Sequence, residues 1–208
     1  MVTSLGFKTI PVTVLGDRAV GGFDVPALRD LLGLAPDSAA SLTPAQMLEK
    51  YRLIFTAAQR AIMQIPHEKL DAVTPGRERT LRQLTWHIFD RAEDFAALAD
   101  GGEFTAEMTT GYMTRAESYR TSAEIAAYGQ EVLIKLGDLL TDRAQLLDKH
   151  VDTYFGVNTL YNLLSRALSM AAFRLRGTYV YMRMLGIEPV QPLGDDDYSG
   201  IFMPPGNP

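Results

Sequence analysis

The sequence has 208 residues, of which 47% are hydrophobic and 22% charged, and a net charge of −5 at pH 7. This composition is typical of a globular chain with one or two domains, and the dispersed basic residues argue against a nucleic-acid partner. The absence of cysteine excludes disulfides, thiolate metal sites and cysteine nucleophiles. No signal-peptide pattern opens the chain and no segment approaches the roughly 18 apolar residues of a membrane span, so we expect a cytoplasmic protein without a membrane partner.

The first 34 residues are predicted to form a small ββα unit. Two runs rich in β-branched residues, 9–15 and 18–20, flank Gly16-Asp17, and this spacing favours a tight β-hairpin. Asp24 is predicted to cap a short helix that follows. Because such a unit is too thin to hold a core alone, we expect it to pack against the rest of the chain.

The segment from residue 43 to residue 190 contains four long stretches with helical periodicity, after a linker at 35–42. Their predicted capping residues are Thr43, Thr80, Thr121 and Asn158. In the second stretch, apolar residues recur on one face from Leu81 to Leu98, which predicts one continuous helix. The sequence therefore predicts a mainly α protein, an up-down four-helix bundle with a ββα extension and an irregular tail at 191–208. We leave a homodimer as an open alternative, because no apolar stripe in the sequence requires a second copy to cover it.

The connection between the second and third predicted helices, residues 101–119, is unusually long for a bundle. Long connections in compact domains often carry function. We therefore expect it to cover a site.

Arg174 interrupts the inward-facing stripe of the fourth predicted helix. A buried guanidinium without a partner costs several kcal/mol, so it should meet a carboxylate, a ligand anion or a path to water. A structural pairing or snorkelling to the bundle end is one interpretation, and binding of a ligand anion is another. A wrong helical phase is the third.

His87 lies near the apolar face of the second predicted helix, one turn before Asp90. A lone histidine in such a place is either a hydrogen-bonded core residue or an acid–base or metal-binding group, and its partner decides. The candidate substrate-binding residues around it are Tyr51, Trp86, Asp90, Met170 and Tyr179. Aromatic residues at helical spacing, as the tyrosines and the tryptophan among them are, more often belong to an ordinary core.

Two segments together resemble the DinB-like four-helix family, which includes metal-dependent thiol S-transferases that use bacillithiol, mycothiol or glutathione. RTLRQLTWHIFDRAE (79–93) is similar to the second-helix signature of the family, whose histidine is a metal ligand. RLRGTYVYMRMLGIEP (174–189) is similar to its closing segment. The resemblance covers about residues 43–190 and implies that His87 occupies a ligand position.

This chain departs from the family pattern at the other two metal ligands. The family carries two histidines four residues apart on its last helix, and here those positions are Met170 and Arg174, or Ala171 and Leu175 in the neighbouring register. Because one neutral ligand cannot retain a divalent ion, we expect no metal. If the first register holds, Arg174 places a fixed cation where relatives hold the metal.

Two functions follow from this departure. The first is a metal-independent transferase, isomerase or lyase that acts on a small anionic or thiol-adduct substrate, with Arg174 holding an anion and His87 as general acid or base. The alternative is a non-catalytic module that binds a small molecule or a partner protein in the degenerate pocket. We expect no cofactor, with glutathione or another low-molecular-weight thiol left open. A DNA-associated role is disfavoured by the acidic charge balance.

The N-terminal unit is also similar to the C-terminal half of glutaredoxins. In that family a cis-proline and a glycine-rich turn bind the backbone of glutathione, and the corresponding residues here are Ile10, Pro11, Gly22 and Asp24. The resemblance implies thiol-peptide binding by residues 5–34. Packing of a generic ββα unit onto the bundle is the alternative.

Overall fold

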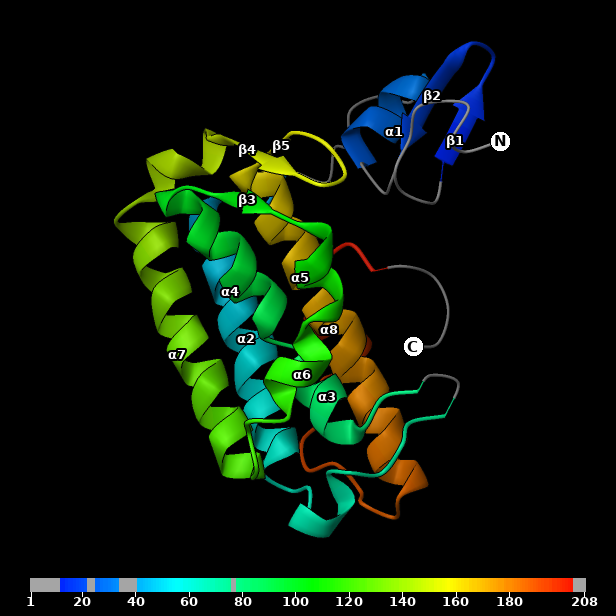
Figure 1. The fold of residues 1–208 in the computed structure, drawn as a ribbon, viewed down its shortest axis with the longest axis vertical. Coiled ribbons are helices and arrows are strands. Elements are labelled where there is room, and N and C mark those ends of the chain that lie inside the picture. The colour runs from blue at the N-terminus through cyan, green and yellow to red at the C-terminus, as the bar shows by residue number, and fades with distance from the viewer. Residues whose placement is uncertain (1–11, 22–24, 34–40, 76–77, 204–208) are drawn as a thin grey trace.

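The protein is mainly helical in the computed structural model, which describes residues 12–21, 25–33, 41–75 and 78–203 (Figure 1). The helices are α1 (Val25–Leu31), α2 (Pro44–Ile62), α3 (Leu81–Trp86), α4 (Asp90–Ala97), α5 (Ala106–Thr110), α6 (Tyr112–Ala116), α7 (Ser122–Thr141) and α8 (Leu160–Met184). The strands are β1 (Val12–Leu15), β2 (Arg18–Gly21), β3 (Glu103–Phe104), β4 (His150–Thr153) and β5 (Asn158–Thr159). Within the described residues, no helix is both long and apolar enough to cross a membrane.

The helical body consists of α2, α3, α4, α7 and α8 and contains the hydrophobic core. Helix α2 packs against α7 and α8, and α4 packs against the same two helices from the other side (Figure 1). The interior is filled by apolar side chains from all of these helices, with Tyr51, Phe55 and Phe89 fully buried among them. Burial of such side chains is the main source of stability in a fold of this kind.

Capping residues set the starts of the long helices. The predicted capping residues Thr43, Thr80 and Thr121 are confirmed, and each forms a capping box in which the threonine hydroxyl accepts a hydrogen bond from the backbone N–H three residues later. The prediction that Asn158 caps the last helix is wrong by one residue. Thr159 is the cap, and its hydroxyl accepts from the backbone N–H of Asn162.

The prediction of one continuous second helix is wrong, because the chain breaks at residues 87–89 between α3 and α4. The backbone N–H groups of Ile88 and Phe89 bond to carbonyls three residues back rather than four, which tightens the turn. Just before the break, the Thr85 hydroxyl donates to the Leu81 carbonyl. Such bonds from serine or threonine to the preceding turn often bend helices. The break puts His87 at the C-terminus of α3 and Asp90 at the start of α4.

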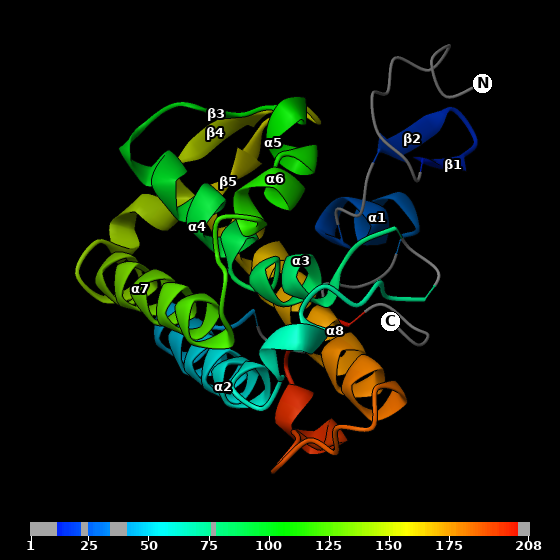
Figure 2. The ribbon, with the colours of Figure 1, turned by 60° about the horizontal axis from the view of Figure 1, so that its bottom comes forward.

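The long connection after α4 is more ordered than a covering loop. Strand β3 pairs in parallel with β4, which pairs antiparallel with β5, and the short helices α5 and α6 follow β3. Helix α6 lies against α3, as Figure 2 shows. The connection therefore returns over the break between α3 and α4.

The N-terminal hairpin is confirmed, with β1 and β2 antiparallel around a turn in which Gly16 has a φ of 60°. Glycine adopts this left-handed conformation at no steric cost. Helix α1 follows and contacts β2. Ile10, Pro11, Gly22 and Asp24, the candidate thiol-peptide residues, lie outside the described residues, as does most of the 35–42 linker.

Candidate functional site

His87, Asp90 and Arg174 form a hydrogen-bonded row between the broken second helix and α8. The Nδ1 atom of His87 lies 2.6 Å from Oδ1 of Asp90, and its Nε2 atom lies 2.7 Å from Nη2 of Arg174. Since a carboxylate only accepts and a guanidinium only donates, Nδ1 carries the imidazole proton and Nε2 accepts from Arg174. Both nitrogens of His87 are therefore occupied in this arrangement.

Burial sets the charge states in this row. Burial and, next, the positive charge of Arg174 lower the pKa of His87 far below its usual range, so the imidazole is neutral. Burial raises the pKa of Asp90 to about 6, and the neighbouring guanidinium groups limit the rise. Burial also lowers the pKa of Arg174 to about 9, which leaves it charged at neutral pH.

Two further arginines and a second carboxylate complete a polar cluster, which we define as His87, Asp90, Arg91, Asp94, Arg115 and Arg174. Arg115 of α6 is 2.9 Å from Asp94 and 3.4 Å from Asp90. Arg91 is 3.3 Å from Asp94 and 3.7 Å from Asp90. The cluster holds three guanidinium groups and two carboxylates, so it carries an excess of positive charge.

One guanidinium nitrogen in the cluster is left without a partner. Although Arg174 as a residue is half-buried, its Nη1 atom is buried and donates to no group within the part of the chain that the structure describes. A buried donor left unpaired costs about 1–3 kcal/mol, more when it is charged. Nη1 is therefore the atom in the cluster best suited to an anion.

Tyr112, the first residue of α6, covers the face of the His87 imidazole. The two rings are stacked at a centroid distance of 3.7 Å and an interplanar angle of 10°. The connection thus does lie over the predicted site, and an aromatic side chain takes the place closest to His87.

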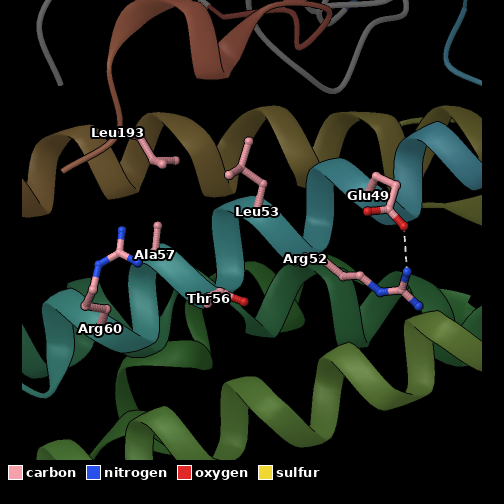
Figure 3. A pocket seen from close by; sticks show the side chains of 7 residues that line it. All are labelled: Glu49, Arg52, Leu53, Thr56, Ala57, Arg60 and Leu193. Atoms are coloured by element: carbon pink, nitrogen blue, oxygen red, sulfur yellow. Dashed lines mark hydrogen bonds and ion pairs between the residues drawn. The ribbon is translucent and has the colours of Figure 1, made fainter. Parts of the chain in front are cut away.

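Two pockets of the described residues lie away from this cluster. A groove of about 340 Å³ on the outer side of α2 is lined by Glu49, Arg52, Leu53, Thr56, Ala57, Arg60 and Leu193 (Figure 3). A smaller one of about 150 Å³ lies beside Tyr181 and Met184 near the end of α8. Because neither contains a member of the polar cluster, we place the candidate site by its buried charges and its unpaired donor rather than by cavity size.

The other predicted substrate-binding residues are scattered. Tyr51 is buried in the core and its hydroxyl donates to the Leu164 carbonyl, while Tyr179 accepts from the backbone of Leu193 in the tail. Trp86 stacks on Tyr128 and lies beneath Arg115. Met170 is half-buried one turn before Arg174 on α8. Of the aromatic candidates, Trp86 alone contacts the polar cluster.

Sequence reasoning missed four residues of the site: Arg91, Asp94, Tyr112 and Arg115. Arg91 and Asp94 lie in the same charged stretch as Asp90, and a count of charges on an otherwise buried helix could have indicated them. Nothing in the connection distinguishes Tyr112 and Arg115 from its other polar and aromatic residues.

No group of three or more potential metal-binding side chains of the His, Cys, Asp and Glu types occurs among the described residues. His87 and Asp90 are two adjacent side chains of these types in the polar cluster. His87 also contacts the guanidinium of Arg174, and Asp90 that of Arg115. In comparisons with known proteins, no family model matches the chain and no curated protein matches it significantly.

Proposed function

We propose that this chain is a DinB-like four-helix bundle in which a guanidinium takes the place of the metal, and that Arg174 binds the anionic group of a small molecule. One observation carries the proposal: Nη2 of Arg174 is held by His87 while its buried Nη1 has no acceptor among the described residues. A carboxylate on Nη1 would gain a charge-assisted hydrogen bond in a place that water reaches poorly.

The row from Asp90 through His87 supports this role because it fixes the guanidinium. Asp90 orients the imidazole through Nδ1, and the imidazole in turn holds Nη2 through Nε2. Histidine metal ligands are commonly oriented in the same way by a carboxylate on the other ring nitrogen. A pre-positioned cation binds an anion with less loss of side-chain entropy than a mobile one.

The arrangement of the long helices supports the bundle part of the proposal. Helices α2, α7 and α8 and the broken α3–α4 segment provide four helical walls around one core. The His87 and Arg174 contact joins the second wall to the last, which are the two walls that carry the metal ligands in the family.

Binding without turnover is the function that needs the fewest further steps. His87 can take a proton at Nε2 only after Arg174 leaves that atom. The second candidate is a metal-independent transferase, isomerase or lyase. It is favoured by the contact between the lone pair on Nε2 of His87 and the guanidinium of Arg174, which would bind the substrate anion. An anion that draws Arg174 toward itself would free Nε2 as the acid–base group. A small acid or a thiol adduct with a carboxylate, such as a glutathione conjugate, fits either version.

A thermal-shift series with acetate, succinate and glutathione at millimolar concentrations tests the proposal. We expect these anions to raise the melting temperature of the wild type and of the control Arg183→Met, whose arginine forms an exposed ion pair with Glu188. Arg174→Met should lose the response. Equal responses in Arg174→Met and the wild type would overturn the proposal, and turnover of any ligand found would select the enzyme.

A further inference from the structure

Tyr112 is held over His87 by a weakly anchored segment. Helices α5 and α6 have five residues each, and Ala116 is the one residue of both that is fully buried. The segment follows β3, which is paired with β4 and holds Phe104 in the core, so α5 and α6 alone form the weakly anchored part. Segments with few buried contacts open at low free-energy cost, so this one can leave the site without unfolding the helical body.

The strongest attachment of α6 is polar. Arg115 binds Asp94 and Asp90, yet its side chain is 41% exposed and its guanidinium also rests on the Trp86 ring at 5.1 Å. An anion entering the cluster competes with these carboxylates for the same cationic surroundings. Ligand entry and movement of α6 are therefore linked.

The stacked ring indicates the shape of the missing ligand. Both ring nitrogens of His87 are already bound to Asp90 and Arg174, so a ligand would contact the flat face of the imidazole. Tyr112 now occupies that face with a parallel ring, but the nearby Nη1 of Arg174 stays unpaired among the described residues. A flat ring that also carries a carboxylate would satisfy both the face and the donor.

We infer that Tyr112 is an internal plug and that the site takes a planar aromatic carboxylate, whose ring replaces Tyr112 on His87 while its carboxylate meets Arg174. This inference rests on the proposed anion site and adds the class of ligand. The wild type binds such a ligand with reduced affinity, because the plug must first leave.

Isothermal titration calorimetry on the full chain, with benzoate, cyclohexanecarboxylate and acetate as probes, tests the inference. We expect Tyr112→Ala to bind benzoate about tenfold more tightly than the wild type, since no ring has to be displaced. This variant should prefer benzoate to cyclohexanecarboxylate about fivefold, because the second probe has the same charge but no flat ring. Tyr112→Phe keeps the ring and should match the wild type.

The outcomes separate the inference from the function it rests on. Equal binding of benzoate and cyclohexanecarboxylate to Tyr112→Ala would overturn the aromatic class and leave the anion site standing. Equal binding of benzoate to the wild type and Tyr112→Ala would overturn the plug. If none of the three carboxylates binds Tyr112→Ala, both the anion site and this inference fail. If the alanine variant does not fold, Tyr112→Leu replaces it: it should show the same preference for benzoate over cyclohexanecarboxylate, and a smaller gain in benzoate affinity because its side chain must still be displaced.

Discussion

The α2–α7 pair and the α3–α4 pair belong to the same helical body but bury different kinds of residue. Every buried residue of α2 and α7 is apolar, a tyrosine or a glycine, and both helices are continuous over about five turns. In contrast, the buried residues of α3 and α4 include Arg82, Asp90, Arg91 and Asp94, and the two helices are separated by a break at His87.

The two pairs of helices therefore place different demands on the geometry of the fold. Apolar packing along α2 and α7 needs no special geometry beyond matching shapes. Buried charges must instead be paired, and Asp90 at the start of α4 is shared between His87 at the end of α3 and Arg115 of α6. The break therefore lies inside the polar cluster, and the proposed function depends on the pair of helices that buries charged residues.

The largest effect is expected from Asp90→Asn at about pH 7.5. This change replaces a buried carboxylate that accepts from His87 and contacts Arg115 by an amide, so that one of its two oxygen positions becomes a donor and Asp94 is the one carboxylate of the cluster left beside three guanidinium groups. We expect the free energy of unfolding to fall by about 3–5 kcal/mol in urea denaturation, the usual cost of breaking a buried pair from one side.

Glu49→Gln is the matched control for that experiment. Glu49 is paired with Arg52 at the surface, where both side chains are more than half exposed. Its loss should cost less than about 1 kcal/mol. Similar costs for the two variants would mean that the polar cluster does not depend on acceptors at both oxygen positions of residue 90.

Two glycines of α7 test the same comparison through smaller changes in the free energy of unfolding. A Cβ added to Gly129 would lie 2.6 Å from the ring of Phe89, whereas one added to Gly137 meets nothing within 4 Å. Gly129→Ala should therefore destabilise the protein by about 1–3 kcal/mol, because α7 would push into the α3–α4 break. Gly137→Ala should stabilise it by up to about 1 kcal/mol through helix propensity. Stabilisation by both changes, measured by urea denaturation, would show that Phe89 yields easily.

The sequence sufficed where local chemistry decides the structure. The hydroxyls of Thr43 and Thr121 predicted helix starts correctly because a cap depends on residues three positions away. The inward placement of Arg174 followed from helical period, and its contact with His87 agrees with that placement.

The rest of the site depends on contacts that local pattern cannot report. The apolar period of residues 81–98 continues through the break, because α3 and α4 face the same core on either side of it. The approach of Tyr112 to His87 and of Arg115 to Asp94 depends on how a long connection folds back. Such tertiary contacts override sequence periodicity. They also set the burial and the charged neighbours of each ionisable group, so the sequence could not predict the charge states of the cluster.

The smallest expected effect is a change in the pH dependence of stability. The native pKa of His87 lies far below the unfolded value of 6.5, so below that pH the unfolded chain takes up a proton that the native protein refuses, and stability falls as pH falls. The pKa of Asp90 shifts the other way, from 3.8 to about 6, so in that window the native protein takes up the proton and stability rises as pH falls. In the wild type these two contributions oppose each other between about pH 4 and 6. Asp90→Asn removes the second one, and its free energy of unfolding should fall by about 1 kcal/mol per pH unit more steeply than that of the wild type in urea titrations across that range. Arg115 and Arg174 stay charged throughout this range and Asp94 is present in both proteins, so parallel curves would mean that Asp90 and His87 are not the opposing pair.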